Sequence, residues 1–82
     1  MTKEELLAVV DKTAENELRI IFPIVLKTLE REFHYGSTVV IPLDLEGYNT
    51  NMAVTIMNKI VQRLEGLGYD SHSRLPNEVV VK

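Results

Sequence analysis

The beginning of the chain carries a regular apolar pattern that fits a helix of many turns. Between residues 3 and 35, steps of three or four residues separate the apolar positions Leu7, Val10, Ala14, Leu18, Ile21, Val25, Leu29 and Phe33. These steps are close to a period of about 3.67 residues, which keeps one stripe on one side of a straight helix. Thr2 and Glu5 have the spacing of a capping box, in which a hydroxyl and a carboxylate satisfy free amides at a helix start. The pattern predicts one long helix whose stripe faces the core.

Pro23 interrupts this helix. A proline in a helix interior donates no backbone hydrogen bond and clashes with the preceding turn, at a cost of about 3 kcal/mol. Because the stripe keeps its phase across Pro23, we expect one kinked helix, with two abutting helices as the alternative. Gly36 is the expected terminator, since glycine readily adopts the left-handed conformation that ends many helices.

A second apolar set lies on a flank of the same helix, a quarter-turn or more from the stripe. It consists of Leu6, Val9, Ile20 and Ile24, and we call it the flank. One small sheet covers one stripe but hardly both. Two hypotheses account for the flank: the second helix of the same chain covers it, or it is the interface of a homodimer or higher oligomer.

The middle of the chain predicts a strand and a second helix. The strand alternates polar positions with Val39, Ile41, Leu43 and Leu45. Pro42 lacks a ladder donor and therefore places this strand at a sheet edge. Asn49, Thr50 or Asn51 caps the second helix, which runs through Leu64. Its expected core stripe is Ala53, Ile56, Met57, Ile60, Leu64 and Leu67, and Gly66 or Gly68 ends it.

The end of the chain predicts a β-hairpin. One strand spans residues 69–74, the "LPNE" turn contains Pro76, and the return strand spans residues 79–82. Because "VVV" is the most apolar strand, it suits the centre of the sheet. We therefore expect a single α+β domain of residues 1–82, with a three-stranded antiparallel sheet and both helices on one face.

Composition excludes several kinds of function. The chain has no cysteine, so disulfides, cysteine-ligated zinc, iron–sulfur clusters and thiol nucleophiles are excluded. Its net charge is −3, from 9 basic and 12 acidic interspersed residues, which gives no basic footprint for nucleic acid. The longest apolar run, residues 20–26, is far shorter than the roughly 20 residues that span a bilayer. We expect a soluble cytoplasmic protein without membrane contacts.

The stretch "GYDSHSR" is the main candidate for a binding site. On a strand, Asp70, His72 and Arg74 share one face, opposite Tyr69 and the serines. One interpretation is a sheet edge, where polar and charged residues discourage pairing with other chains. The other is a recognition surface for a partner or an anionic ligand, whose contact residues are His72, Arg74, Asn77, Tyr69 and Tyr48.

Catalysis finds little support in the residue types. Asp70 and His72 suit a base and its orienting group, but no nucleophile is evidently placed beside them. The two histidines, His34 and His72, are far apart and in no metal-ligand motif. We therefore expect a protein that is not an enzyme and that uses neither a metal nor a cofactor.

The stretches "HYGSTVVIPLDL", "VQRLEGLGYDS" and "NEVVVK" support a resemblance at the level of the whole pattern. The order of elements is similar to that of small accessory proteins encoded by bacteriophages, many of which run α-β-α-β-β. The resemblance includes no functional motif, so it assigns no site residue. It implies a location in the host bacterial cytoplasm and binding to a host component, either a defence protein or a signalling nucleotide.

Three functions remain as hypotheses. The first is a non-catalytic interaction protein that self-associates and binds and inhibits or sequesters a host macromolecule. The second is an oligomeric small-ligand binder that sequesters an anionic signalling nucleotide, with Lys59 and Arg63 as further cationic contacts. The third, nucleic-acid binding, ranks lowest because of the net charge.

Overall fold

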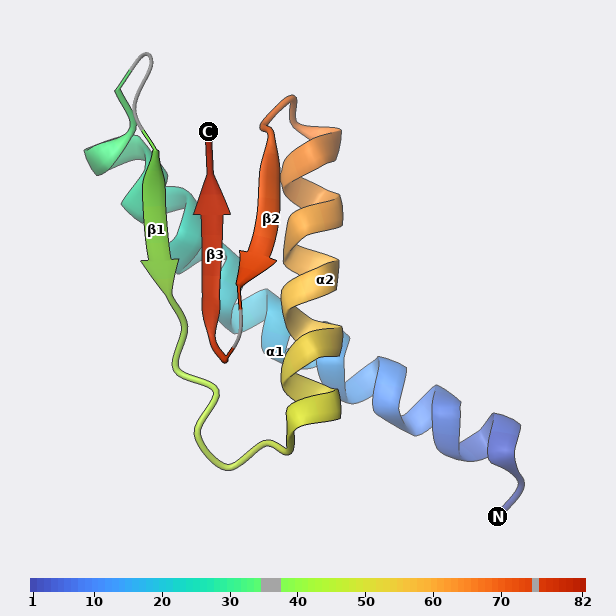
Figure 1. Cartoon of the computed structure of the whole chain (residues 1–82). Helices are drawn as coiled ribbons and strands as arrows, with labels where there is room; N and C mark the ends of the chain where they lie inside the picture. Colours follow the sequence, from blue (N-terminus) through green and yellow to red (C-terminus); the bar gives the residue numbers. More distant parts are fainter. Residues whose placement is uncertain (35–37, 75) are drawn as a thin grey trace.

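The computed structural model describes residues 1–34, 38–74 and 76–82. The chain order is α1 (Lys3–Glu32), β1 (Val39–Pro42), α2 (Thr50–Gly66), β2 (Ser71–Arg74) and β3 (Glu78–Val81), shown in Figure 1. Two helices and a three-stranded antiparallel sheet confirm the predicted α+β class and its order of elements.

The α1 helix runs without interruption through Pro23, which excludes the alternative of two abutting helices. Its start is as predicted, because the backbone N–H of Glu5 donates to the Thr2 hydroxyl at 3.1 Å. Its predicted end at residue 35 is wrong. Phe33 already has extended backbone angles, and its ring packs edge-to-face on the ring of Tyr69, with 5.7 Å between ring centroids. The expected terminator, Gly36, lies outside the described residues.

The β3 strand lies between β1 and β2, and both pairings are antiparallel. Near the middle of β3, Val80 pairs with Val40 of β1 on one side and with His72 of β2 on the other. This confirms the predicted strand order. It also puts Pro42 in an edge strand, where a missing backbone donor is best tolerated.

Both helices pack on one face of the sheet, as predicted (Figure 1). The sheet contributes Val39, Ile41, Val79 and Val81 to the core on this face. On the other face, Val40 is 39% exposed and Val80 only 5%. From the helices, the core receives Ala14, Leu18, Ile21, Val25 and Leu29 of α1 and Ala53, Ile56, Met57, Ile60 and Leu64 of α2.

The ends of α2 follow from its capping residues. The backbone N–H of Met52 donates to the Asn49 side chain at 2.8 Å, so Asn49 is the N-cap. Gly68 has a φ of 95°, and the N–H of Tyr69 reaches back to the Leu64 carbonyl at 3.0 Å. This is a Schellman-type end, which requires a left-handed residue. Leu67 was expected in the core but is 60% exposed, because the helix has already ended there.

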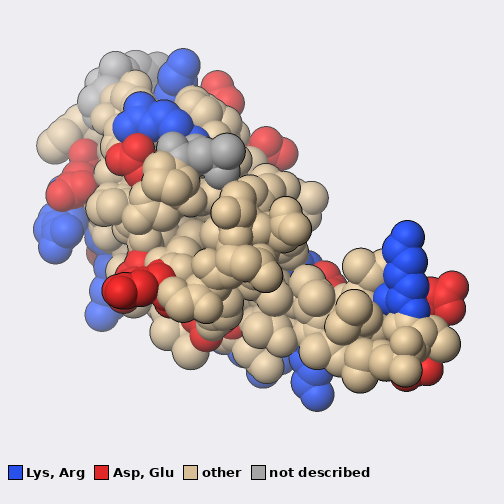
Figure 2. Space-filling model, turned by 60° about the horizontal axis from the view of Figure 1, so that its bottom comes forward, with Lys and Arg blue, Asp and Glu red and all other residues tan. Residues whose placement is uncertain are grey.

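The α1 helix is longer than anything that packs on it. Thirty residues span about 45 Å, whereas the 17 residues of α2 span about 26 Å. The first buried residue of α1 is therefore Ala14, and residues 3–9, which are all exposed and which we call the arm, project beyond the body (Figures 1 and 2). The predicted core stripe is wrong at its two ends, where Leu7 is 55% and Phe33 is 37% exposed.

Candidate interaction surfaces

The structure separates the five predicted contact residues into three places. His72 and Arg74 project from the face of the sheet that the helices do not cover. Tyr48 and Asn77 line a groove beside the loop that follows β1. Tyr69 packs against the core and against Phe33. The five residues therefore do not form one site.

Arg74 is already paired within the sheet. Its Nε and Nη2 lie 2.9 and 2.8 Å from Oε1 of Glu78, the residue opposite it in the β2–β3 register. His72 is exposed beside this pair. The ion pair neutralises the cation on which an anion-binding site at this edge would depend.

The groove has a volume of about 650 Å³. Apolar side chains of Leu43, Leu45 and Ala53 form part of it, and the carboxylates of Asp44 and Glu46 belong to its lining. No cationic side chain is among the residues that line it. This charge is unfavourable for an anionic nucleotide.

Asn77 and Tyr48 each form a hydrogen bond to a distant part of the chain. The Leu43 N–H donates to the Asn77 carbonyl and the Asn77 side-chain amide donates to the Leu43 carbonyl, both at 2.8 Å. A hydrogen bond to the Glu17 carboxylate, aided by burial, raises the pKa of Tyr48 above 10.0. This bond stabilises the fold below pH 10 and is lost as the pH rises through the raised pKa. Both residues therefore have structural roles.

The flank of α1 is an exposed surface made of large apolar side chains. Leu6 is 54%, Val9 50%, Ile20 63% and Ile24 58% exposed. The hypothesis that the second helix covers the flank is therefore wrong.

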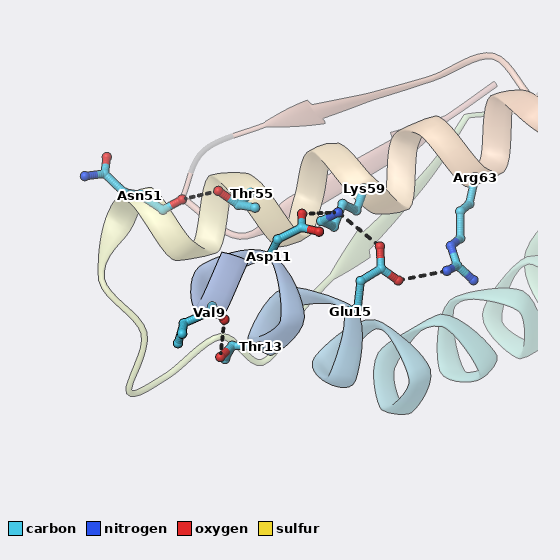
Figure 3. A network of polar contacts seen from close by, with 8 residues as sticks. All are labelled: Val9, Asp11, Thr13, Glu15, Asn51, Thr55, Lys59 and Arg63. Atoms are coloured by element: carbon cyan, nitrogen blue, oxygen red, sulfur yellow. Dashed lines mark hydrogen bonds and ion pairs between the residues drawn. The ribbon is translucent and has the colours of Figure 1, made fainter. Parts of the chain in front are cut away.

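The reason is the side from which α2 approaches. It meets α1 at Asp11 and Glu15, which lie roughly 140–180° around the helix from Ile20. Figure 3 shows Val9 and Thr13 on the side of α1 that faces away from α2.

An ionic network joins α1 and α2 on the side of α1 that faces α2 (Figure 3). Lys59 Nζ lies 2.7 Å from Asp11 Oδ1 and 3.0 Å from Glu15 Oε1, and Arg63 Nη2 lies 3.0 Å from Glu15 Oε2. Lys59 and Arg63 were the predicted contacts for an anionic ligand, and both are engaged here. The sequence contained a signal for this network, because acids four residues apart on one helix face bases four residues apart on the other.

The network makes stability depend on pH in the acid range. The hydrogen bond and charge of Lys59 lower the pKa of Glu15 below 4.5, and Asp11 and Glu15 raise the pKa of Lys59 above 10.5. A lowered carboxyl pKa means that the unfolded chain binds more protons, so stability falls as the pH drops from about 4.5 through the folded pKa. Urea unfolding of the wild type is expected to show this loss, and Glu15→Gln is expected to reduce it. Glu30→Gln, an exposed control outside the network, should leave it intact, and an equal loss in all three proteins would contradict the assignment.

The described residues contain no group of three or more His, Asp or Glu side chains able to hold a metal ion. Ser71, the buried hydroxyl nearest to His72 in sequence, is 6% exposed and has no hydrogen-bond partner among them. Since neighbouring side chains alternate between faces of a strand, His72 projects from the opposite face and cannot activate it.

In the part of the chain that the structure describes, no helix has the length and apolar character needed to cross a membrane. Comparison with known protein families, with curated proteins and with solved structures found no match to this chain.

Proposed function

We propose that this protein is a non-catalytic interaction protein that binds a macromolecule through α1. The observation that carries the proposal is the exposed flank, together with the arm that extends it beyond the body. Helices in proteins draw most of their stability from the packing of an apolar face. An arm that keeps Leu6, Leu7 and Val9 half or more exposed therefore gains stability when another surface covers it.

The shape of this surface favours a macromolecule over a small ligand. From Leu6 to Ile24 the flank extends over about 27 Å of helix, and an apolar helix face of this kind is typically laid into a groove or against another helix. The resemblance to bacteriophage accessory proteins extends the proposal to a host protein that is bound and inhibited.

The anionic-nucleotide alternative receives less support. Arg74, Lys59 and Arg63 all have carboxylate partners within the chain, and the groove is lined by acids. Native mass spectrometry of protein purified from a bacterial cytoplasm distinguishes the two. A retained mass of a few hundred daltons would favour the nucleotide and count against the proposal.

The direct test is photo-crosslinking in bacterial cells. A photoreactive amino acid replaces Val9 on the flank or, as a control, Ala8, its exposed neighbour about 100° away around the same helix. We expect protein adducts from position 9 and few or none from position 8, and their masses identify the partner. Equal adducts at both positions, or none at either, would contradict docking through the flank.

A further inference from the structure

The flank is nearly symmetric about its own centre. Thr13 and Asn16 lie on the same side of α1, between its two apolar halves. Four residues outward from this centre reach Val9 in one direction and Ile20 in the other, and the outer members of the flank follow three and four residues further on. Reversing the direction of the helix therefore superposes the flank on itself to within one residue, or about 1.5 Å of rise.

We propose that the flank is covered by the same flank of a second copy, with the two α1 helices antiparallel about a two-fold axis between residues 14 and 15. This inference rests on the proposed function and identifies the macromolecule bound at the flank as a second copy of this chain. Leu6 then meets Ile24 of the second copy, and Val9 meets Ile20. A two-fold interface must be self-complementary in this way, because the same patch serves both copies.

The charges at the two ends favour the antiparallel orientation. The first turn of α1 is acidic, with Glu4 and Glu5, and Lys27 lies on the flank side near the other end of the seam. Antiparallel pairing sets Glu5 of one copy near Lys27 of the other, whereas parallel pairing sets like charges together at both ends. Antiparallel helix dipoles also attract rather than repel.

The centre of the seam has polar residues that suit burial. The Thr13 hydroxyl donates to the Val9 carbonyl at 2.9 Å within its own helix, so it needs no partner across the seam. Asn16 meets Thr13 of the second copy twice, once on each side of the axis. A polar pair in an otherwise apolar helix seam fixes its register.

The arrangement also accounts for the arm. The segment that carries Ile20 and Ile24 is backed by the core through Leu18, Ile21 and Val25. Antiparallel pairing lays each arm on this supported segment of the other copy. Both exposed halves of the flank are then covered by one contact repeated twice.

The oligomeric state in solution tests whether a second copy of the chain covers the flank. The wild type is expected to be a dimer by sedimentation equilibrium, and Ile20→Asp a monomer at the same concentrations, because it buries two carboxylates in the seam. Ala8→Asp adds the same charge to an exposed position outside the flank and should remain a dimer. A wild type that is monomeric throughout overturns the inference, as does an Ile20→Asp variant that stays folded and dimeric.

Single cysteines test the orientation without depending on a disruptive variant. The chain has no cysteine of its own, so Val9→Cys and Ile20→Cys proteins can be mixed and oxidised mildly. The antiparallel seam predicts mainly the mixed disulfide between positions 9 and 20, identified by its mass. Disulfides only between like positions would overturn the antiparallel arrangement. If the photoreactive residue at position 9 captures a different protein while the chain itself stays monomeric, the inference fails and the proposed function stands.

Discussion

Replacing Leu18 with alanine is expected to lower the free energy of unfolding by about 2–5 kcal/mol. Leu18 is fully buried in the middle of α1 and belongs to the core that both helices share with the sheet. The truncation removes apolar contacts and leaves a cavity that its close-packed neighbours fill only in part. Domains of this size have a small margin of stability, so a loss of this size removes much of it.

The measurement is urea unfolding followed by circular dichroism at fixed protein concentration, since the proposed self-association would contribute to apparent stability. Leu67→Ala is the matched control, because the same atoms are removed from a side chain that is 60% exposed. It should change the free energy by about 0.5 kcal/mol or less. Equal losses at positions 18 and 67 would mean that the core is not built around Leu18.

Replacing Pro23 with alanine is expected to raise the free energy of unfolding by up to about 3 kcal/mol. Pro23 lies inside the continuous α1 helix, and a proline in a helix interior costs about 3 kcal/mol relative to alanine. Alanine restores a donor for the Arg19 carbonyl and removes the clash with it.

The readout is again urea unfolding, with thermal unfolding as a second measure. Glu30→Ala serves as a control for helix propensity alone, because Glu30 is exposed on the same helix and glutamate is already a good helix former. A Pro23→Ala variant that is no more stable than this control would show that the surrounding packing depends on the backbone geometry that proline imposes.

Several features of the fold could be predicted from local patterns in the sequence. The period of the apolar stripe predicted α1, and its unchanged phase across Pro23 predicted one helix rather than two. Alternation predicted β1. The candidate caps Asn49, Thr50 and Asn51 and the candidate terminators Gly66 and Gly68 located the ends of α2, and the structure selects Asn49 and Gly68. The apolar "VVV" predicted the central position of β3. Each of these follows from interactions within a few residues, or from the solvent exposure of a strand, which the pattern of side chains records directly.

The roles of the candidate binding residues could not be predicted in the same way, because these roles depend on partners far away in the sequence. Arg74 suggested an anion site until the register placed Glu78 opposite it. Asn77 suggested a contact residue, but it binds the backbone of Leu43, 34 positions away. The sequence names the polar side chains and cannot tell which of them another part of the same chain already engages.

The sequence by itself determined that α1 has two apolar faces, since both the stripe and the flank are properties of helical spacing. The sequence also predicted that the stripe faces the core, and only the tertiary structure decided that the flank stays outside it. The approach of α2 is set by its ionic contacts with Asp11 and Glu15 and by the shared core, all of them long-range interactions that no local pattern encodes. Since α1 is also longer than its partners, the flank and the arm remain outside that core.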